Sequence, residues 1–231
     1  MKTAGLIGGT SWLSTVEYYR IINQEVNRRL GGYKFAKCII YSIDHGDIID
    51  NNKSDNQKGN FLLILNAAES LIKAGAEFIV LCANTTHIFA DDLQDRIPVP
   101  LIHIGESIAN EINKMDFKKV GLLGTKTTME KDFLKSKLKE RNIDIIIPEI
   151  NDRDYIHNSI INELIKNIFS DKTRKEFIRI IKGLKNMGAE GIILGCTEIP
   201  LLIKQDDVDI PLFDTTYIHS VSAVDFALKN Y

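Results

Sequence analysis

The chain has 231 residues, of which 44% are hydrophobic and 26% are charged, and its formal net charge is −2. This composition predicts a soluble globular protein with a sizeable core, and it excludes strong attraction to nucleic acid or to an anionic membrane. No apolar run approaches the roughly 20 residues that a membrane-spanning helix needs. The short apolar run at residues 4–7 does not match a secretion signal, so we expect a cytoplasmic protein.

Short apolar runs alternate along the chain with longer stretches of helical periodicity. The predicted strands are residues 4–8, 37–42, 78–82, 101–104, 120–124, 144–147, 191–194 and 212–213. The predicted helices include residues 14–30, 57–74, 106–115, 129–141, 156–169 and 172–186. The most polar stretch, residues 44–58, predicts a mobile loop. This alternation is typical of an α/β fold with mostly parallel sheets covered by helices on both faces.

The two halves of the chain repeat each other. Residues 4–8 match residues 120–124, residues 75–81 match residues 188–194, and residues 100–102 match residues 211–213. Three ordered matches at nearly constant spacing predict two pseudo-symmetric α/β domains, the first at residues 1–105 plus 215–231 and the second at 106–214. Ligands of open α/β sheets bind beyond the carboxyl ends of the strands, so the predicted active site lies in a cleft between the domains.

Three cysteines, Cys38, Cys82 and Cys196, form neither a CxxC pair nor an even set, which indicates free thiols and no metal site. Cys196 follows a predicted strand and precedes a predicted helix with Pro200 in its first turn. Amide groups at a helix start lower the pKa of a nearby thiol, so this position favours a reactive thiolate. A lone cysteine is also commonly a small buried hydrophobic residue, and this segment alone leaves both interpretations open.

Five segments together resemble the successive motifs of the aspartate/glutamate racemase family, in the same order from end to end. They are Ile-Gly-Gly-Thr-Ser-Trp (7–12), Leu-Cys-Ala-Asn-Thr-Thr-His (81–87), Leu-Leu-Gly-Thr (122–125), Leu-Gly-Cys-Thr-Glu-Ile-Pro (194–200) and Phe-Asp-Thr-Thr (213–216). Glutamate racemases typically carry histidine where this chain has Glu198, so the resemblance favours the aspartate or broad-specificity branch.

The resemblance implies racemisation of an amino acid without a metal or pyridoxal cofactor. One group removes the α-proton and a second group delivers a proton to the opposite face of the same carbon, because inversion needs an acid and a base on opposite sides. Cys196 is the expected group of the second domain. The implied partner is an amino acid or dicarboxylate substrate, with no nucleic acid and no membrane. Relatives are commonly dimers, so a homodimer is one expected assembly.

The first-domain motif departs from the family pattern. Relatives have a thiol directly before Asn-Thr, whereas this chain has Ala83 there and Cys82 one residue earlier. Because successive strand residues point to opposite faces, Cys82 is expected to point away from the position that mirrors Cys196. Three explanations follow. Cys82 still reaches the site, or another group acts as the partner (Thr85, Thr86, Ser11 or His87), or the protein has one working thiol and does not racemise, as in the related arylmalonate decarboxylases.

The resemblance also identifies candidate contacts to substrate carboxylates. Asn84 and Thr197 occupy matching positions in the repeat, and capping of a helix is the alternative role for such residues. A tight turn is the alternative role for residues 10–11, and a solvated helix position is the alternative for Lys166. The expected substrate-binding residues are Thr10, Ser11, Asn52, Asn84, Thr85, Thr86, Thr125, Thr127, Lys166 and Thr197. A family member that only binds a dicarboxylate remains a further alternative, because alanine cannot carry a proton.

Overall fold

The computed structural model describes residues 1–229 and 231, which divide into two compact units. Unit 1 comprises residues 1–103 and 219–231, and unit 2 comprises residues 104–218. Each unit contains a four-stranded sheet whose paired strands are all parallel, which confirms the predicted α/β class. No helix in the described part of the chain is both long enough and apolar enough to cross a membrane.

Unit 1 has the strand order β2-β1-β3-β4. Its elements are β1 (Ala4–Gly8), α1 (Trp12–Leu30), β2 (Cys38–Ser42), α2 (His45–Lys53), α3 (Gln57–Lys73), β3 (Phe78–Leu81), the 3-10 helix η1 (Thr85–Phe89), α4 (Ala90–Gln94) and β4 (Leu101–Ile102). Helix α11 (Thr215–Leu228) begins in unit 2, and its residues from His219 onward belong to unit 1.

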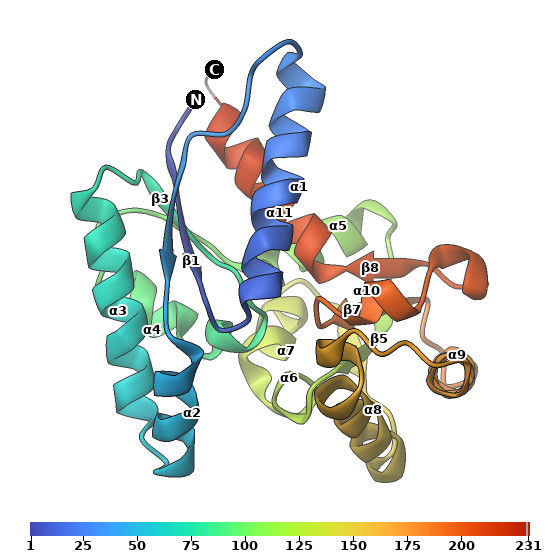
Figure 1. Ribbon diagram of the computed structural model, residues 1–231. Coiled ribbons are helices and arrows are strands. Elements are labelled where there is room, and N and C mark those ends of the chain that lie inside the picture. Colours follow the sequence, from blue (N-terminus) through green and yellow to red (C-terminus); the bar gives the residue numbers. More distant parts are fainter. Residues whose placement is uncertain (230) are drawn as a thin grey trace. The chain divides into compact units, whose positions relative to one another are not determined.

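Two hydrophobic clusters cover the two faces of the unit 1 sheet. On one face, Ile79 and Leu81 of β3 pack with α3 and α4. On the other face, Phe78, Val80 and Cys82 pack with α1 and the C-terminal part of α11. Figure 1 shows this arrangement, with α3 on one side of β1 and with α1 and α11 on the other. The alternation along β3 follows directly from the pleat of a strand that is buried on both faces.

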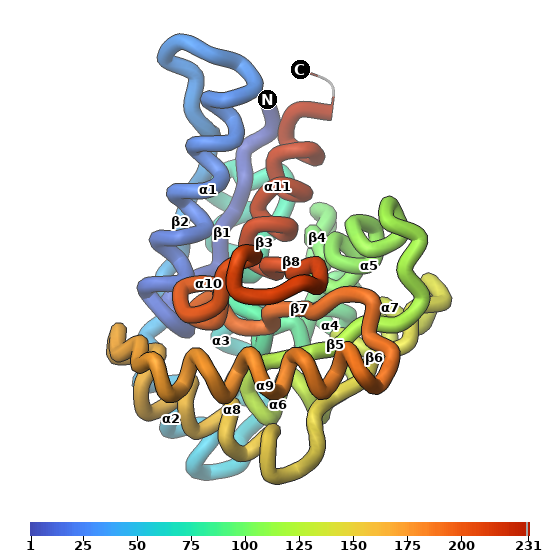
Figure 2. Tube along the Cα trace, turned by 90° about the vertical axis from the view of Figure 1, so that its right-hand side faces the viewer, coloured from blue at the N-terminus to red at the C-terminus, as the bar shows by residue number. Residues whose placement is uncertain are grey.

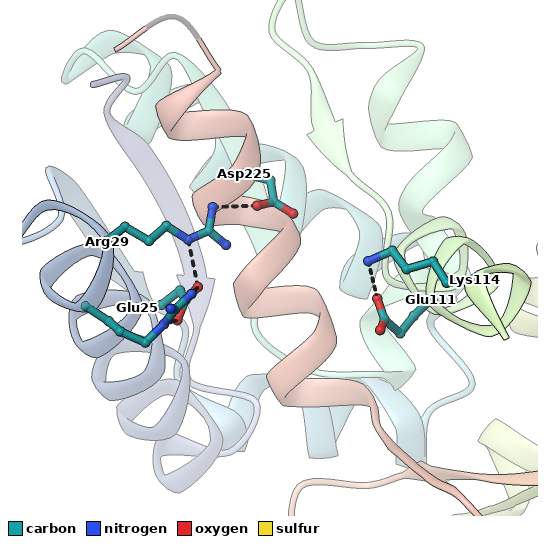
Figure 3. Close-up of polar contacts among 6 residues, drawn as sticks. Glu25, Arg29, Glu111, Lys114 and Asp225 are labelled. Carbon is teal, nitrogen blue, oxygen red and sulfur yellow. Dashed lines mark hydrogen bonds and ion pairs between the residues drawn. The ribbon is translucent and has the colours of Figure 1, made fainter.

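An ion-pair chain joins the two helices on the second face. Arg29 of α1 contacts Glu25 at 2.7 Å and Asp225 of α11 at 2.6 Å, and Arg28 also bonds Glu25 (Figure 3). Glu25 is buried, and hydrogen bonds from Arg28 and Arg29 lower its pKa to about 2. These ion pairs therefore attach the end of α11 to α1 within unit 1.

Unit 2 has the strand order β6-β5-β7-β8 around one large core cluster. Figure 2 shows α8 and α9 beside each other in this unit. Its elements are α5 (Ile104–Lys114), β5 (Lys119–Gly124), α6 (Lys126–Glu130), α7 (Asp132–Lys139), β6 (Asp144–Ile146), α8 (Ile150–Asn162), the 3-10 helix η2 (Leu164–Lys166), α9 (Asp171–Asn186), β7 (Gly191–Gly195), α10 (Ile199–Leu202), the 3-10 helix η3 (Gln205–Asp207) and β8 (Leu212–Asp214).

The repeated Gly-Ala-Glu segment has the same structural role in both units. Gly75 follows α3 and Gly188 follows α9, with φ of 101° and 93°, a backbone region that favours glycine after a helix. The carboxylate of Glu77 then accepts the backbone N–H of Thr3, and that of Glu190 accepts the N–H groups of residues 118 and 119. Each repeat therefore ends a helix and fixes the start of the neighbouring central strand.

Two expectations about individual elements are wrong. Residues 44–58 do not form a mobile loop, because α2 occupies His45–Lys53 and Asp44 caps it by accepting the N–H of Gly46. The single helix expected at residues 129–141 is two helices, since Lys131 has an extended backbone with ψ of 161° between α6 and α7. In the first case the signal was missing because α2 has no buried residue and therefore no apolar periodicity.

Candidate active site

Cys196 lies directly after the last residue of β7, at the carboxyl end of the unit 2 sheet. The pairing of β5 with β7 ends at Gly124 and Gly195, so Thr125 and Cys196 leave the sheet side by side. A side chain on Gly195 would come within 2.9 Å of the Leu123 carbonyl oxygen, so this close approach requires glycine. Cys196 itself is partly buried. The strand end thus holds the thiol at the edge where α/β sheets bind ligands.

Glu198 gives this thiol a polar partner. The Cys196 thiol donates to Glu198 Oε2 at 2.8 Å, and the Thr197 hydroxyl donates to the same oxygen at 2.8 Å. Glu198 is only 6% exposed, so its charge acts on the thiol with little screening by water. Burial, the negative charge of Glu198 and this hydrogen bond together raise the pKa of the Cys196 thiol well above its usual value.

The thiolate expected from the helix start is therefore wrong for this structure. Amide groups of residues 197 and 198 do lower the thiol pKa, but they are weaker than burial and Glu198. Helix α10 has only four residues, so its field is small. The resting group is a protonated thiol with a carboxylate beside it.

The other candidate residues of unit 2 lie at α6 and in η2. Thr125 caps α6 by accepting the N–H of Thr128 at 3.3 Å, beside the end of β7. Thr127 is exposed on α6, one residue before the fully buried Thr128. Lys166 is exposed in η2. Thr125 therefore lies beside the end of β7, and Thr197 shares the Glu198 carboxylate with the thiol.

Ala83 occupies in unit 1 the place that Cys196 occupies in unit 2. Cys196 directly follows β7, and Ala83, two residues after the end of β3, is the residue that matches it at the spacing of the repeat. Both residues are partly buried. Cys82 is 1% exposed and packs in the cluster with Phe78 and Val80. Burial raises the pKa of the Cys82 thiol far above its usual value. The position in unit 1 that matches Cys196 thus carries a methyl group, and the neighbouring Cys82 thiol is buried in the core.

The residues after Ala83 form one compact turn. Asn84 and Thr86 are buried, whereas Thr85 is partly exposed at the start of η1. Asn84 makes no side-chain capping bond to η1, so the capping role does not explain it. The Thr86 hydroxyl donates to the Ala83 carbonyl at 2.9 Å, so Thr85 is the hydroxyl residue of this turn that is partly exposed.

Thr10 and Ser11 follow the end of β1, which pairs with β3 up to Ile7 and Leu81. Both are partly buried, and Ser11 caps α1 by accepting the N–H of Ser14 at 3.4 Å. These residues are therefore close in the sheet to the turn after β3. Asn52 is exposed on α2 and accepts the Nδ2–H of Asn60 at 2.8 Å, so a buried amide holds its side chain.

Three further hydroxyl residues, which the sequence pattern does not predict, form hydrogen bonds to the backbone near the strand ends. Ser14 donates to the Cys82 carbonyl at 2.6 Å, and Thr215 donates to the Leu194 carbonyl at 3.0 Å. Thr15 accepts the N–H of Gly9 at 2.9 Å. All three are buried. A hydroxyl in the first turn of a helix is too common a pattern to single them out from sequence.

No group of three or more His, Cys, Asp or Glu side chains in the described residues has the arrangement of a metal site. The buried histidines of unit 1, His87, His103 and His219, make ring contacts with one another instead. The site residues offer a thiol, a carboxylate, hydroxyls and amides. These groups can move protons and hold a carboxylate-bearing ligand.

The model of the Asp/Glu/hydantoin racemase family matches residues 7–223. A candidate Asp/Glu racemase of Yersinia pestis has a solved structure that is 44% identical, covers 99% of this chain and 100% of its own, and superposes with a TM-score of 0.95. An aspartate racemase homologue of Pyrococcus horikoshii is 38% identical over 99% of this chain and 100% of its own, with a TM-score of 0.87. The broad-specificity amino-acid racemase RacX of Bacillus subtilis is 27% identical over 70% of this chain and 69% of its own length.

These matches extend over both units, and the strand ends described above fall inside the matched range. The chain belongs to the Asp/Glu/hydantoin racemase family and is an isomerase of the Asp/Glu racemase type.

Proposed function

We propose that the protein racemises an amino acid of the aspartate, glutamate or related class by direct proton transfer at the α-carbon, with Cys196 as one acid/base group. The observation that carries this proposal is the Cys196–Glu198 pair at the end of β7. The relatives support the reaction class, since they include glutamate racemases and a broad-specificity amino-acid racemase. By the family resemblance, the reaction needs no metal and no pyridoxal cofactor.

The Cys196–Glu198 pair allows Cys196 to act as an acid or as a base. As an acid, the protonated thiol delivers its proton to the α-carbanion and becomes a thiolate. As a base, the thiol first passes its proton to Glu198 Oε2 along the 2.8 Å hydrogen bond, and the thiolate then takes the α-proton. Glu198 thus holds the thiol proton while Cys196 acts as the base. Positioned proton transfer of this kind contributes about 10²–10⁴-fold to rate.

The second acid/base group is sought among the residues of the turn after β3. Cys82 lies in the core, and Thr86 and His87 both bond the Ala83 carbonyl, so none of these three is free to meet substrate. Thr85 is the partly exposed hydroxyl residue of the same turn, and we assign it the second proton transfer. An alcohol gives up and takes a proton less readily than a thiol, so kcat is expected to differ between the two directions. The ratio kcat/KM stays equal in both directions, because the two enantiomers are equally stable.

By the family resemblance, we assign substrate binding to the polar residues that follow the repeated strands of each unit. Asn84, Thr85 and Thr197 supply donors for carboxylate oxygens, together with Thr10, Ser11 and Thr125. Donors already fixed in place stabilise the negative charge that develops on the α-carboxylate, which is usually the largest catalytic contribution. We keep Asn52 and Lys166 as candidate contacts for the side-chain carboxylate of the substrate.

The decisive experiment is proton NMR in D₂O with L- and D-aspartate and L- and D-glutamate, combined with chiral chromatography. Deuterium at the α-carbon together with the opposite enantiomer supports the proposal. The Cys196→Ala variant must lose both signals, and the Cys82→Ala variant is the matched control that must keep them. Exchange that persists in Cys196→Ala would contradict the role of the thiol.

The alanine at position 83 favours a second candidate function, a lyase that uses one thiol. Such an enzyme protonates a carbanion left by decarboxylation and needs no group on the opposite face. A substituted malonate that releases CO₂ with this protein, while no amino acid exchanges its α-proton, would favour it. Saturable binding of a dicarboxylate without either reaction would instead indicate a member of the family that only binds.

A further inference from the structure

The carbonyl oxygen of Ala83 accepts two side-chain hydrogen bonds. The Thr86 hydroxyl lies 2.9 Å from it, and Nδ1 of His87 lies 2.9 Å from it. A carbonyl oxygen only accepts, so Nδ1 must carry the ring proton. His87 is therefore the neutral Nδ1–H tautomer. Its other nitrogen, Nε2, is buried and has no hydrogen-bond partner among the described residues.

The His87 ring is fixed from behind by two other histidines. It lies 5.1 Å from the ring of His103 and 5.1 Å from the ring of His219, in edge-to-face contacts. His219 is itself held, because Nε2 lies 2.7 Å from the Ile102 carbonyl and Nδ1 lies 2.9 Å from the Tyr18 hydroxyl. The Ile102 bond assigns the His219 proton to Nε2, so Tyr18 donates to Nδ1. All five residues belong to unit 1.

The matching turn of unit 2 has no equivalent of this arrangement. At the spacing of the repeat, Pro200 stands where His87 stands, and Ile199 stands where Thr86 stands. The carbonyl of Cys196 accepts only a backbone bond that the structure records, from the N–H of Ile199 at 3.3 Å. The reinforced carbonyl is therefore specific to the turn that lacks a thiol, and the repeat fold alone does not require it.

We infer that His87 is a positioning residue that fixes the Ala83–Asn84–Thr85 turn for binding of the substrate carboxylate. This inference rests on the proposed function, in which Asn84 and Thr85 contact substrate. His87 does not touch substrate itself, because its side chain is buried and only 1% of the residue is exposed. Burial and the two neighbouring histidines hold the pKa of His87 well below its usual value, so the ring stays neutral over the usual assay range. The groups that face it are His103 and His219, and the ion pairs of Glu25 and Asp225 lie further along α1 and α11.

Three substitutions separate the hydrogen bond from the volume of the ring. His87→Asn keeps an N–H close to the place of Nδ1, and His87→Gln moves the amide toward the place of Nε2. His87→Leu fills the volume without a donor. We expect His87→Leu and His87→Gln to raise the KM for L-aspartate about tenfold while kcat changes less than about twofold, because one buried hydrogen bond is lost. His87→Asn should restore KM to near the wild-type value.

The experiment measures steady-state KM and kcat by chiral chromatography, α-proton exchange by NMR, and folding by circular dichroism. Long-range ¹H–¹⁵N correlation of the wild-type histidines reads the tautomer independently of activity. No α-proton exchange in the wild-type protein would overturn the proposed function. Normal wild-type exchange with an Nε2–H tautomer at His87, or with equal KM in the Asn and Leu variants, would overturn only the inference. Should His87→Leu fail to fold, the Asn and Gln pair provides the same comparison.

Discussion

The two units are built alike up to the last residue of the repeated strand, and they differ at the next residue. In both units a glycine turn follows the helix, a glutamate fixes the start of the central strand, and the following strand pairs with it. Beyond that strand, unit 2 has Cys196 with Glu198, whereas unit 1 has Ala83 with Thr85. The shared residues explain the fold, and the proposed function places the chemistry on the differing residues.

The difference also concerns how each turn is held. In unit 2 the Glu198 carboxylate accepts a hydrogen bond from the Cys196 thiol, so it directly influences the pKa of that thiol. In unit 1 the bonds go to the backbone carbonyl of Ala83, through Thr86 and His87. The hydrogen bonds of one turn therefore go to the side chain that we propose as the acid/base group, and those of the other turn go to the backbone.

Removing the thiol should have the largest effect on this comparison. We expect Cys196→Ala to lower α-proton exchange by at least about 10³-fold, since the variant lacks the thiol and keeps only the weaker Thr85 hydroxyl as an acid/base group. Cys82→Ala should leave exchange within about twofold, because that thiol is in the core. Deuterium incorporation measured by NMR checks both variants. A large loss in Cys82→Ala with normal folding would show that the buried thiol reaches the substrate.

Restoring the symmetry should sharpen the comparison. Ala83→Cys places a thiol at the position that mirrors Cys196, and we expect it to raise the rate of inversion by about 10-fold or more relative to exchange. The ratio of inversion to exchange, from chiral chromatography and NMR on one sample, measures this. The variant Ala83→Ser is the control for side-chain size. An unchanged ratio in Ala83→Cys would mean that position 83 does not face the α-carbon.

Glu198 gives the unit 2 turn a carboxylate where the unit 1 turn has the hydroxyl of Thr85. Glu198→Gln removes the negative charge and the carboxylate acceptor, two of the causes that raise the pKa of Cys196. We therefore expect the pKa of Cys196 to fall toward its usual value, and we expect exchange to slow about 10-fold because the proton store is lost. The pH dependence of alkylation by iodoacetamide reports the thiol. A thiol pKa that rises or stays constant in Glu198→Gln would contradict this assignment.

Acid should affect unit 1 through its buried histidines. Burial lowers the pKa of His219 from 6.5 to about 4, so the unfolded chain binds a proton between these values that the folded chain does not. The unfolding free energy of unit 1 is therefore expected to fall by up to roughly 3 kcal/mol as pH drops from 6.5 to 4. Glu25 has a folded pKa of about 2, so its stabilisation is lost only below about 4.5. Hydrogen exchange followed by mass spectrometry at pH 7 and pH 5 would show it.

In that experiment, protection should decrease first in α11 and in the strands that contact it. His219→Asn removes the titrating group and should flatten the change with pH, although it lowers stability at pH 7. An equal loss of protection in β5 and β7 would indicate that the acid effect is general to the chain.

The sequence predicted the strands of both sheets within about two residues, because strands that are buried on both faces read as short apolar runs. It also predicted that Cys82 would point away from the site, since the pleat alternates side chains and the structure places Cys82 with Phe78 and Val80. The roles of the predicted site residues stay predictions. Sequence pattern could not reveal α2, which buries no residue and is stabilised by capping.

The electrostatics of the site were also beyond the sequence. The position of Cys196 before a helix suggested a lowered thiol pKa, but the pKa depends on the direction of the Glu198 side chain and on burial. Neither follows from spacing along the chain. The same is true of His87, whose contact with His219 joins segments more than one hundred residues apart in the chain numbering.

The use of residues from both ends of the chain in unit 1 has a consequence for synthesis. Ala223 and Val224 complete the cluster that covers one face of the unit 1 sheet. A ribosome makes these residues only after all of unit 2, whose residues 104–218 are contiguous. Unit 2 can therefore close its core first, while Phe78 and Val80 of unit 1 wait with an uncovered apolar face. Chaperones that recognise exposed apolar strands should bind nascent chains that end before residue 219, and they should release them once α11 has emerged.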